Sequence, residues 1–393
     1  MSTQRFRPAS DREAAELIRD AALGGTSFEI TSSGTKRNLG RPVAANAILD
    51  MSALAGAIDY KPEELVLSAK AGTRLVEIEA LLAQHNQMLG FEPCDWGPFF
   101  GAPAGQHTIA GVIAADLCGP RRVKSGSARD HVIGCHFING RGEIIKAGGT
   151  VIKNVTGFDI SKLMCGAFGT LGVLTEVSLR VLPRAKHSAT LVLRDLPPDE
   201  GLSAVIAAAQ TPADATALAY LPPWATGRGS RGEAVIRIEG TAAAIEEKVA
   251  LLRGRFPEAE TALLNDEETE FLFRRIGDGS LFDREADIWR LCVPPSRAAN
   301  AIAEAGAQLW YADWAGGLLW LQLPASTENA QRLRGITARF GGHATLFRAG
   351  GEARRMIDVF EPETPVRSRL TKAIKQAFDP EHMFNRGRMF EDL

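Results

Sequence analysis

Glycine is concentrated in one stretch of this sequence, which limits what that part of the chain can fold into. Residues 101–183 contain 14 of the 39 glycines, and most of these stand at a turn or beside Thr, Ser or Ala rather than inside a long apolar helix. Glycine tolerates positive φ and lets main-chain N–H groups approach a ligand closely, which is how proteins hold pyrophosphate groups with few charged side chains. The glycines could merely separate short strands, but the order of the neighbouring segments favours a backbone folded around a ligand.

A second phosphate-binding segment is predicted nearer the N-terminus. Phe28–Ile30 has the pattern of a strand, and it runs into Ser33–Arg37, a polar turn that contains Gly34 and the two cations Lys36 and Arg37. A diphosphate carries about two negative charges, so a turn with free amides and two cations suits it. The alternative is a solvated basic turn with no ligand.

The pattern of elements predicts an α+β fold with more than one domain, because 393 residues are too many for one ordinary core. Residues 10–23 and 365–378 have the pattern of helices. After residue 185 the order strand, helix, strand, strand, helix occurs and then recurs from residue 286, which favours an antiparallel sheet with helices on one face. We interpret residues 185–354 as this cap domain, with an acidic link at 265–270 and a solvated Gly/Pro-rich loop at 221–232.

Composition excludes several classes of function. The 45 basic and 47 acidic residues give a net charge of −2, which argues against a nucleic-acid surface. No apolar run reaches the roughly 20 residues that would span a bilayer, and the N-terminus lacks the apolar core of a secretory signal. We therefore expect a cytoplasmic protein.

The five cysteines are widely spaced and odd in number, which fits a reducing compartment and buried single thiols. An iron–sulfur cluster needs several thiolates at short spacing, so this chain is not expected to hold one. No metal site is predicted, and any cluster would belong to a partner.

Five short motifs in a fixed order carry a resemblance to a known family. They are Ser33–Arg37, Gly101–Arg122 with Thr108-Ile109-Ala110-Gly111, Lys153–Asp159, Phe168–Val173 and Phe378–Pro380. The chain resembles flavoproteins with a vanillyl-alcohol-oxidase-type (PCMH-type) FAD-binding domain, and more closely the smaller FAD-binding subunits, the E subunits, of bacterial glycolate oxidases. The resemblance covers residues 1 to about 185 and 355–393, and the middle matches mainly in length and pattern.

The resemblance implies a two-lobed PCMH-type FAD-binding domain at residues 1–184, the cap domain at 185–354 laid over the flavin, and a C-terminal segment, 355–393, that returns to the FAD domain. It also assigns residues to the cofactor. Those expected at the pyrophosphate are Ser33, Gly34, Thr35, Lys36 and Arg37 on one side and Gly105, His107, Thr108, Ala110 and Gly111 on the other. Those expected near the ribose and adenine are Ser125, Ser127, Arg129 and Val173.

Two departures from the family shape the expected chemistry. Many relatives carry a His in the first turn that bonds covalently to the flavin, whereas this chain has Thr35 and Lys36 there, so we expect non-covalent FAD. The larger catalytic relatives carry a His-rich motif in the C-terminal half, and this sequence has none. The remaining candidates for substrate binding and proton transfer are His343, Arg348, Arg290 and Arg388.

The resemblance therefore implies an FAD-binding subunit of a glycolate oxidase that works with a larger FAD-binding subunit and an iron–sulfur subunit. The substrate would be a small 2-hydroxy acid, and the complex could associate peripherally with the inner membrane. Two alternatives stay open: a free-standing dehydrogenase for a D-2-hydroxy acid such as D-lactate, and a non-catalytic assembly subunit.

Overall fold

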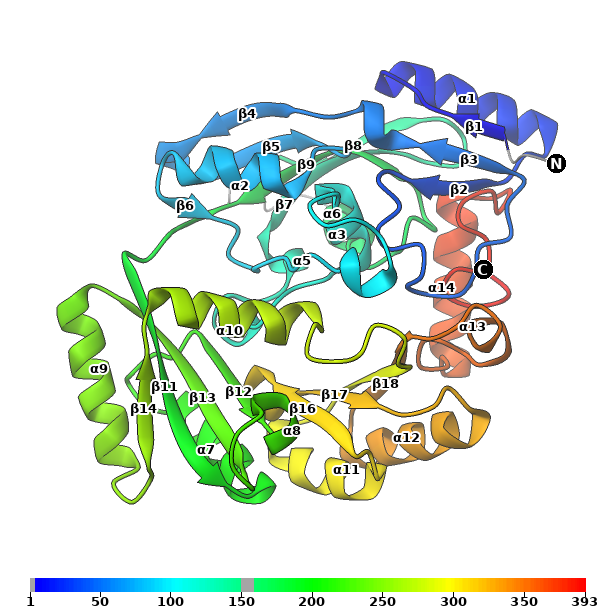
Figure 1. Cartoon of the computed structure of the whole chain (residues 1–393). Helices are drawn as coiled ribbons and strands as arrows, with labels where there is room; N and C mark the ends of the chain where they lie inside the picture. The colour runs from blue at the N-terminus through cyan, green and yellow to red at the C-terminus, as the bar shows by residue number, and fades with distance from the viewer. Residues whose placement is uncertain (1–3, 150–158) are drawn as a thin grey trace. The chain divides into compact units, whose positions relative to one another are not determined.

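The computed structural model describes residues 4–149 and 159–393 (Figure 1). The residues of the Lys153–Asp159 motif before Asp159 therefore lie outside the described residues. The chain divides into two compact units. Unit 1 consists of Met1–Cys118, Gly126–Pro183 and Pro362–Leu393, and unit 2 of Gly119–Ser125 and Arg184–Glu361. The domain boundaries given above, at 184/185 and 354/355, stay predictions.

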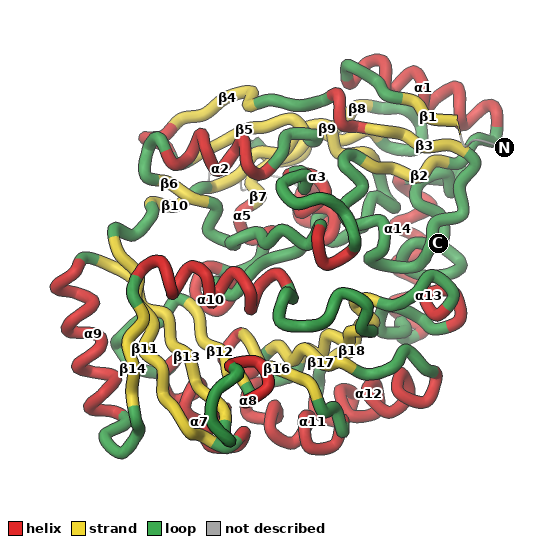
Figure 2. The backbone as a smooth tube through the Cα atoms, in the orientation of Figure 1, coloured by secondary structure: helices red, strands yellow, loops and turns green. Residues whose placement is uncertain are grey.

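Unit 1 contains two main sheets, which form two lobes (Figure 2). The parallel sheet has the order β1-β3-β2, with β1 at Gln4–Phe6, β2 at Phe28–Thr31 and β3 at Ala47–Asp50. The antiparallel sheet has the order β4-β5-β9-β7-β8, with β4 at Ala57–Lys61, β5 at Val66–Lys70, β7 at Val132–Ile138, β8 at Ile144–Gly148 and β9 at Val173–Arg180. A short pair joins β6 (Gln87–Met88) to β10 (Leu182–Pro183).

The helices of unit 1 are short, except at the two ends of the chain. They are α1 (Asp11–Gly24), α2 (Leu75–Ala83), α3 (Ile109–Ala115), α5 (Ala128–His131), α6 (Ile160–Met164) and α14 (Pro365–Phe378). The side chain of Ser10 caps α1 by accepting the amide of Glu13 at 3.2 Å, and Gly25 ends the helix at φ 66°. Both end helices occur where the sequence predicts them. In α1 the two cap residues flank an apolar stripe, and in α14 the side chain of Thr364 caps the first turn by accepting the amide of Arg367.

A buried ion pair fixes the C-terminal segment within unit 1. Lys375 on α14 and Asp379 just after it are both fully buried, and the ammonium Nζ lies 2.7 Å from Asp379 Oδ2. The same Nζ donates to the carbonyls of Thr170 at 2.7 Å and Phe384 at 3.1 Å. Asp379 in turn accepts the amides of Met383 and Phe384 at 3.0 and 2.9 Å. With each charge satisfied on several sides, residues 383–385 lie beside β2, where the Phe28 amide donates to the Met383 carbonyl.

Unit 2 is built on one eight-stranded antiparallel sheet with the order β14-β11-β13-β12-β16-β17-β15-β18. The strands are β11 (His187–Leu196), β12 (Ala217–Leu221), β13 (Gly232–Gly240), β14 (Thr261–Leu264), β15 (Ile288–Cys292), β16 (Leu309–Asp313), β17 (Leu318–Gln322) and β18 (His343–Arg348). Each half runs strand, helix, strand, strand, helix, strand, and the two halves meet where β12 pairs with β16 at Tyr220 and Ala312. Numbered within its half, each set of four has the spatial order 4-1-3-2, so the predicted repeat is confirmed.

Four helices cover one face of this sheet, as the sequence predicts (Figure 1). They are α7 (Pro198–Ala209), α9 (Ala242–Arg255), α11 (Ala298–Ala305) and α12 (Thr327–Phe340). A fifth, α10 (Asp266–Asp278), lies on the other face, where Thr269 contacts Thr190 at 2.9 Å and the Ile276 carbonyl accepts the hydroxyl of Tyr311 at 2.8 Å. The three shorter helices are α4 (Arg122–Ser125), α8 (Pro223–Thr226) and α13 (Ala353–Met356).

Three local predictions in unit 2 are wrong. The acidic link at 265–270 is the start of α10: Asn265 and Glu268 form a capping box, and acidic residues stabilise the first turn of a helix. The prediction ends the first copy of the repeat with a helix and omits its fourth strand, β14, which the structure contains. The loop predicted at 221–232 contains α8, which Pro223 can begin because proline is tolerated in the first turn.

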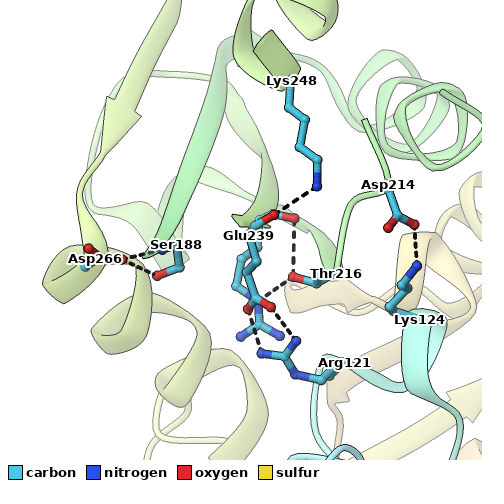
Figure 3. Close-up of polar contacts among 9 residues, drawn as sticks. Arg121, Lys124, Ser188, Asp214, Thr216, Glu239, Lys248 and Asp266 are labelled. Carbon is cyan, nitrogen blue, oxygen red and sulfur yellow. Dashed lines mark hydrogen bonds and ion pairs between the residues drawn. The ribbon is translucent and has the colours of Figure 1, made fainter. Parts of the chain in front are cut away.

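The Gly119–Ser125 segment is held within unit 2 by ion pairs, which Figure 3 shows, and by a hydrogen bond from a tryptophan. Arg121 donates through both terminal nitrogens to the two carboxylate oxygens of Glu239, each at 2.6 Å, and Lys124 pairs with Asp214. The carbonyl of Gly119 accepts the indole N–H of Trp314 at 3.1 Å. We call residues 119–125 the strap. The residues directly before and after the strap belong to unit 1.

Substitution of Lys375 tests the role of the buried pair. In Lys375→Met the carboxylate of Asp379 keeps its burial but loses its cation, so the free energy of unfolding should fall by about 3–5 kcal/mol. Urea-induced unfolding followed by far-UV circular dichroism measures the loss. The matched control is Lys372→Met on the same helix, whose partner Asp392 is exposed, and it should cost less than about 1 kcal/mol. Equal losses in the two variants would contradict the assignment.

Candidate functional site

A cavity in unit 1 encloses about 910 Å³ of empty space, part of it open to solvent. The walls come from the end of β2, the turn 32–37, α3, the Phe168–Gly169 turn and the tail residues Asn385 and Arg388. Segments that are far apart in the sequence therefore converge on one space.

The turn after β2 offers a set of unused hydrogen-bond donors to this cavity. Within the described part of the chain, the amides of residues 33–36 donate to no protein group. The hydroxyl of Ser32 also lines the cavity and is buried without a hydrogen-bond partner. Gly34 adopts φ 75°, the left-handed conformation that glycine tolerates, and this curves the turn. Successive free amides in a curved turn form an anion-binding concavity.

Lys36 supplies the positive charge of the site. Lys36 lines the cavity, and the only hydrogen bond that its ammonium makes to a described residue is a long one, 3.5 Å to Thr35 Oγ1. Burial lowers the pKa of its ammonium to about 8, although the nearby carboxylate of Asp95 acts in the opposite direction. Its charge is therefore available to a ligand below that pH.

The other two cations at the turn are committed to the protein. Arg37 binds Glu29 through Nε at 2.7 Å and through a terminal nitrogen, and the hydrogen bond to Glu29 raises the pKa of Arg37. Arg388, a candidate for substrate binding in the sequence, donates to the carbonyls of Lys36 and Arg37 at 2.6 and 3.1 Å. Both side chains thus shape the turn, and the sequence alone did not separate this role from ligand binding.

The N-terminal part of α3 forms the opposite wall through Thr108, Ala110 and Gly111. The amides of Ile109 and Ala110 already donate to the carbonyls of Thr73 and Ala71, at 2.9 and 3.1 Å. A Cβ added at Gly111 would lie 3.3 Å from Thr108 Oγ1 and 3.7 Å from Lys36 Nζ. The absence of a side chain at Gly111 therefore keeps open the space between the helix and the Lys36 ammonium.

Asp95 organises the loop behind this site, and sequence reasoning missed it. Its carboxylate accepts the amides of Gly97 and Gly105 at 3.0 and 2.6 Å and lies 3.2 Å from Nδ1 of the buried His107. Burial acts to raise the pKa of Asp95, but His107 and the two amides outweigh it and lower the pKa to about 2. The spacing Asp95-Trp96-Gly97 is typical of a side-chain-capped turn and was the available signal.

The remaining predicted cofactor residues do not line the cavity. Gly105 and His107 lie in the loop organised by Asp95. Ser127 caps α5, Arg129 is exposed, Val173 is buried in the core with α1, and Ser125 belongs to unit 2. Asn385 does line the cavity, and it was not predicted. Its side chain accepts the Ile30 amide at 2.8 Å and donates to the Phe168 carbonyl at 2.6 Å, which ties the tail to two walls.

The other candidates for substrate chemistry are in unit 2. Arg290 stacks on Trp314, with its guanidinium carbon 5.1 Å from the ring centre. His343 is exposed and pairs with Cys292 across β18 and β15. Arg348 is buried and donates to the carbonyls of Ala286 and Asp283, and burial lowers its pKa to about 10. The structure therefore gives Arg348 a structural task and leaves Arg290 and His343 as candidates.

Two features are absent from the described residues. No helix in residues 4–149 and 159–393 is long and apolar enough to cross a membrane. Over the same residues, no group of three or more His, Cys, Asp or Glu side chains is arranged to hold a metal ion.

Comparison with known proteins defines the class. Residues 3–148 match the FAD binding domain family. The chain is 35% identical over 382 residues to the glycolate oxidase subunit GlcE of Escherichia coli, covering 96% of this chain and 97% of that one. It is 23% identical over 415 residues to a D-lactate dehydrogenase of Archaeoglobus fulgidus, covering 98% and 91%. The fold matches 4-ethylphenol oxidase from Gulosibacter chungangensis with a TM-score of 0.72 at 13% identity, covering 99% and 89%.

These matches and the α+β architecture define an FAD-dependent oxidoreductase with a PCMH-type FAD-binding domain. More particularly, the chain belongs to the family of FAD-linked subunits that includes GlcE of E. coli. The cavity residues fit such a cofactor. Free amides at 33–36, the hydroxyl of Ser32, the Lys36 cation and the open space at Gly111 are the groups that a diphosphate requires.

Substitution of Gly111 tests this placement. The side chain in Gly111→Val should fill the space next to Lys36 and reduce the flavin content below about a tenth of the wild-type value. The measurement is flavin released per protein by trichloroacetic acid, with circular dichroism to establish folding. Gly335→Val, at an exposed helical glycine with open space around it, is the control and should keep its flavin. Full flavin occupancy in a folded Gly111→Val protein would contradict the site.

The pKa of Lys36 predicts how flavin affinity depends on pH. Below about pH 8 the free protein carries the ammonium charge, and above it FAD must bind with uptake of a proton. The Kd for FAD should therefore be flat from pH 6.5 to 7.5 and rise by up to about tenfold per unit above pH 8. Fluorescence titration of the apoprotein measures this. Lys36→Met should bind more weakly without the rise, while Lys146→Met, at an exposed site, should keep it. A flat wild-type profile would refute the role.

Proposed function

We propose that this chain is the FAD-binding subunit of a glycolate oxidase (glycolate dehydrogenase) complex that oxidises glycolate to glyoxylate. The observation that carries the proposal is the 35% identity to GlcE, which extends over 96% of this chain and so includes unit 2 and the tail. The word subunit in the name of that relative favours a multi-subunit assembly. Its other members would be a larger FAD-binding subunit and an iron–sulfur subunit that accepts electrons from the flavin.

The residues of the unit 1 cavity would hold the cofactor without a covalent bond. The amides of 33–36, the Lys36 ammonium and the Thr108 hydroxyl surround the space assigned to the diphosphate, and Arg37 and Arg388 hold the turn in shape. The bound flavin would supply a two-electron acceptor for the hydroxyl-bearing carbon of the substrate. Lys36 contributes by neutralising phosphate charge rather than by moving a proton.

A small 2-hydroxy acid also needs a cation for its carboxylate and a group that accepts the hydroxyl proton. The guanidinium of Arg290 lies on two indole rings and makes no hydrogen bond or ion pair with a described residue, so its charge is available. His343 is an exposed imidazole on the neighbouring strand of the same sheet. We assign these two residues as candidates for carboxylate binding and proton acceptance if the chain has its own substrate site. The complex would act in the cytoplasm. It would lie at the inner membrane if its partner subunits attach there.

A second candidate function is a free-standing dehydrogenase for a D-2-hydroxy acid. The observation that favours it is the similarity to the D-lactate dehydrogenase of A. fulgidus, which extends over 98% of this chain and 91% of that enzyme. A third is an assembly subunit whose flavin does no chemistry. The three candidate functions differ in how the isolated chain reacts with its substrate.

Anaerobic reduction of the flavin separates them. The purified chain with bound FAD is mixed with glycolate or D-lactate, and the flavin absorbance is followed with and without the co-expressed larger and iron–sulfur subunits. We expect slow or no bleaching by the chain alone and fast bleaching with glycolate in the complex. Rapid bleaching of the lone chain by D-lactate would favour the free-standing enzyme. Unchanged activity of the complex after loss of this chain's flavin would favour the assembly subunit.

A further inference from the structure

Cys292 belongs to a cluster of reactive and charged side chains at one end of the unit 2 sheet. It is the last residue of β15, and its cross-strand partner is His343, the first residue of β18. Trp289 and Leu291 enter the core under α11 and α12, so the alternation of the strand places Arg290 and Cys292 on the opposite face. Cys292 is partly exposed and forms no disulfide.

The surroundings of this thiol are electropositive. The guanidinium carbon of Arg290 lies 5.1 Å from the ring centre of Trp314, and that of Arg122 lies 4.7 Å from the same centre. No carboxylate among the described residues forms an ion pair with Arg290. Two guanidinium groups thus share one indole on the face that carries Cys292. Such partly exposed, cationic sites are where reactive cysteines occur.

Tertiary contacts hold Trp314 in a backbone conformation that its residue type rarely adopts. Trp314 and Ala315 have φ values of 53° and 55°, which residues other than glycine rarely take. The Trp314 amide donates to Asp313 Oδ1 at 2.7 Å, and the indole N–H donates to the strap carbonyl of Gly119 at 3.1 Å. Unusual backbone of this kind persists where the surrounding structure fixes it, often at functional sites. Here it positions the ring on which both arginines stack.

The charges of the cluster act on the ionisation of Cys292. Burial by itself raises the pKa of the thiol, but Arg290, His343 and Arg122 together outweigh it and lower the pKa to about 7. In unit 1 the opposite holds, because burial raises the pKa of Cys135 and of Cys165 to about 12. Cys292 therefore has the conditions for a thiolate at neutral pH, in contrast to Cys135 and Cys165.

We propose that Cys292 is a nucleophilic thiolate and the site at which hydroperoxides reversibly oxidise this protein. The sulfur attacks the terminal peroxide oxygen, an S–O bond forms as the O–O bond breaks, and the leaving oxyanion takes a proton to become water or an alcohol. The thiolate loses two electrons and becomes a sulfenic acid, and the peroxide gains them. Arg290 and His343 stabilise the thiolate and the departing oxyanion. This inference does not rest on the proposed function.

Competitive alkylation of the full-length protein tests it, with the other four cysteines as internal controls. The folded holoprotein is treated with limiting iodoacetamide from pH 6 to 9, and each cysteine peptide is quantified by mass spectrometry. Cys292 should react fastest, at pH 7 at least about a hundredfold faster than Cys135 or Cys165, and its rate should reach half its maximum near pH 7. Labelling of Cys292 no faster than of Cys94 would overturn the proposal.

Substitutions in the cluster test whether its charges, rather than the exposure of Cys292 alone, make the thiol reactive. His343→Gln and Arg290→Gln should each slow alkylation of Cys292 by about threefold at pH 7 and move the midpoint upward, and Arg290→Lys should restore most of the rate. Arg274→Gln, at an exposed arginine on α10, should leave the rate unchanged. With hydrogen peroxide and dimedone, the trapped sulfenic acid should map to Cys292 and vanish in Cys292→Ser. Dimedone on another cysteine, or wild-type rates in both neutralising variants, would refute the assignment.

Discussion

The ion pair between Lys375 and Asp379 is the interaction on which the cavity depends. Removing two charges from water is costly unless their remaining hydrogen-bonding positions are filled, and here two carbonyls and two amides fill them. The pair fixes residues 383–385 beside β2. Asn385 reaches the Phe168 carbonyl from there, and Arg388, three residues on, reaches the carbonyls of the phosphate turn. A wall formed near residue 33 is therefore held by groups about 350 positions later in the sequence.

The phosphate turn shows where sequence reasoning succeeds and where it stops. A strand followed by a Gly-containing polar turn was sufficient to find Ser33–Arg37, because the signals are local. The partners of the two cations are not local information. Glu29 binds Arg37, so of these two cations only Lys36 is left for a ligand, and burial lowers the pKa of its ammonium to about 8. Positive φ at Phe168 likewise follows from tertiary contacts rather than from residue preference. The tail residues at the cavity could thus be assigned only by resemblance or by structure.

The cap region was predictable to a different extent. The periodicity of apolar residues revealed the repeat, and the order 4-1-3-2 in each half follows from the usual packing of such units. The join between the halves is a single register pair, Tyr220 with Ala312, and no pattern in the sequence specifies it. No sequence pattern indicates that residues 119–125 belong to unit 2 while the glycine-rich residues on both sides of them belong to unit 1. Their anchor is the pair Arg121–Glu239, 118 positions apart, which depends on the complete sheet.

The strap means that neither unit is a contiguous module. The chain passes between the units four times, at 118/119, 125/126, 183/184 and 361/362. A fragment that begins at Arg184 would keep Arg237 but lose Arg121, the other arginine that pairs with Glu239, and it would also lose the carbonyl that binds the Trp314 indole. Splitting this protein for separate expression at the obvious interdomain boundary would therefore leave a nearly buried carboxylate with one of its arginines missing. An autonomous form of the second unit would need residues 119–125 grafted back, and gene fusion or domain exchange with this chain has to carry both segments together.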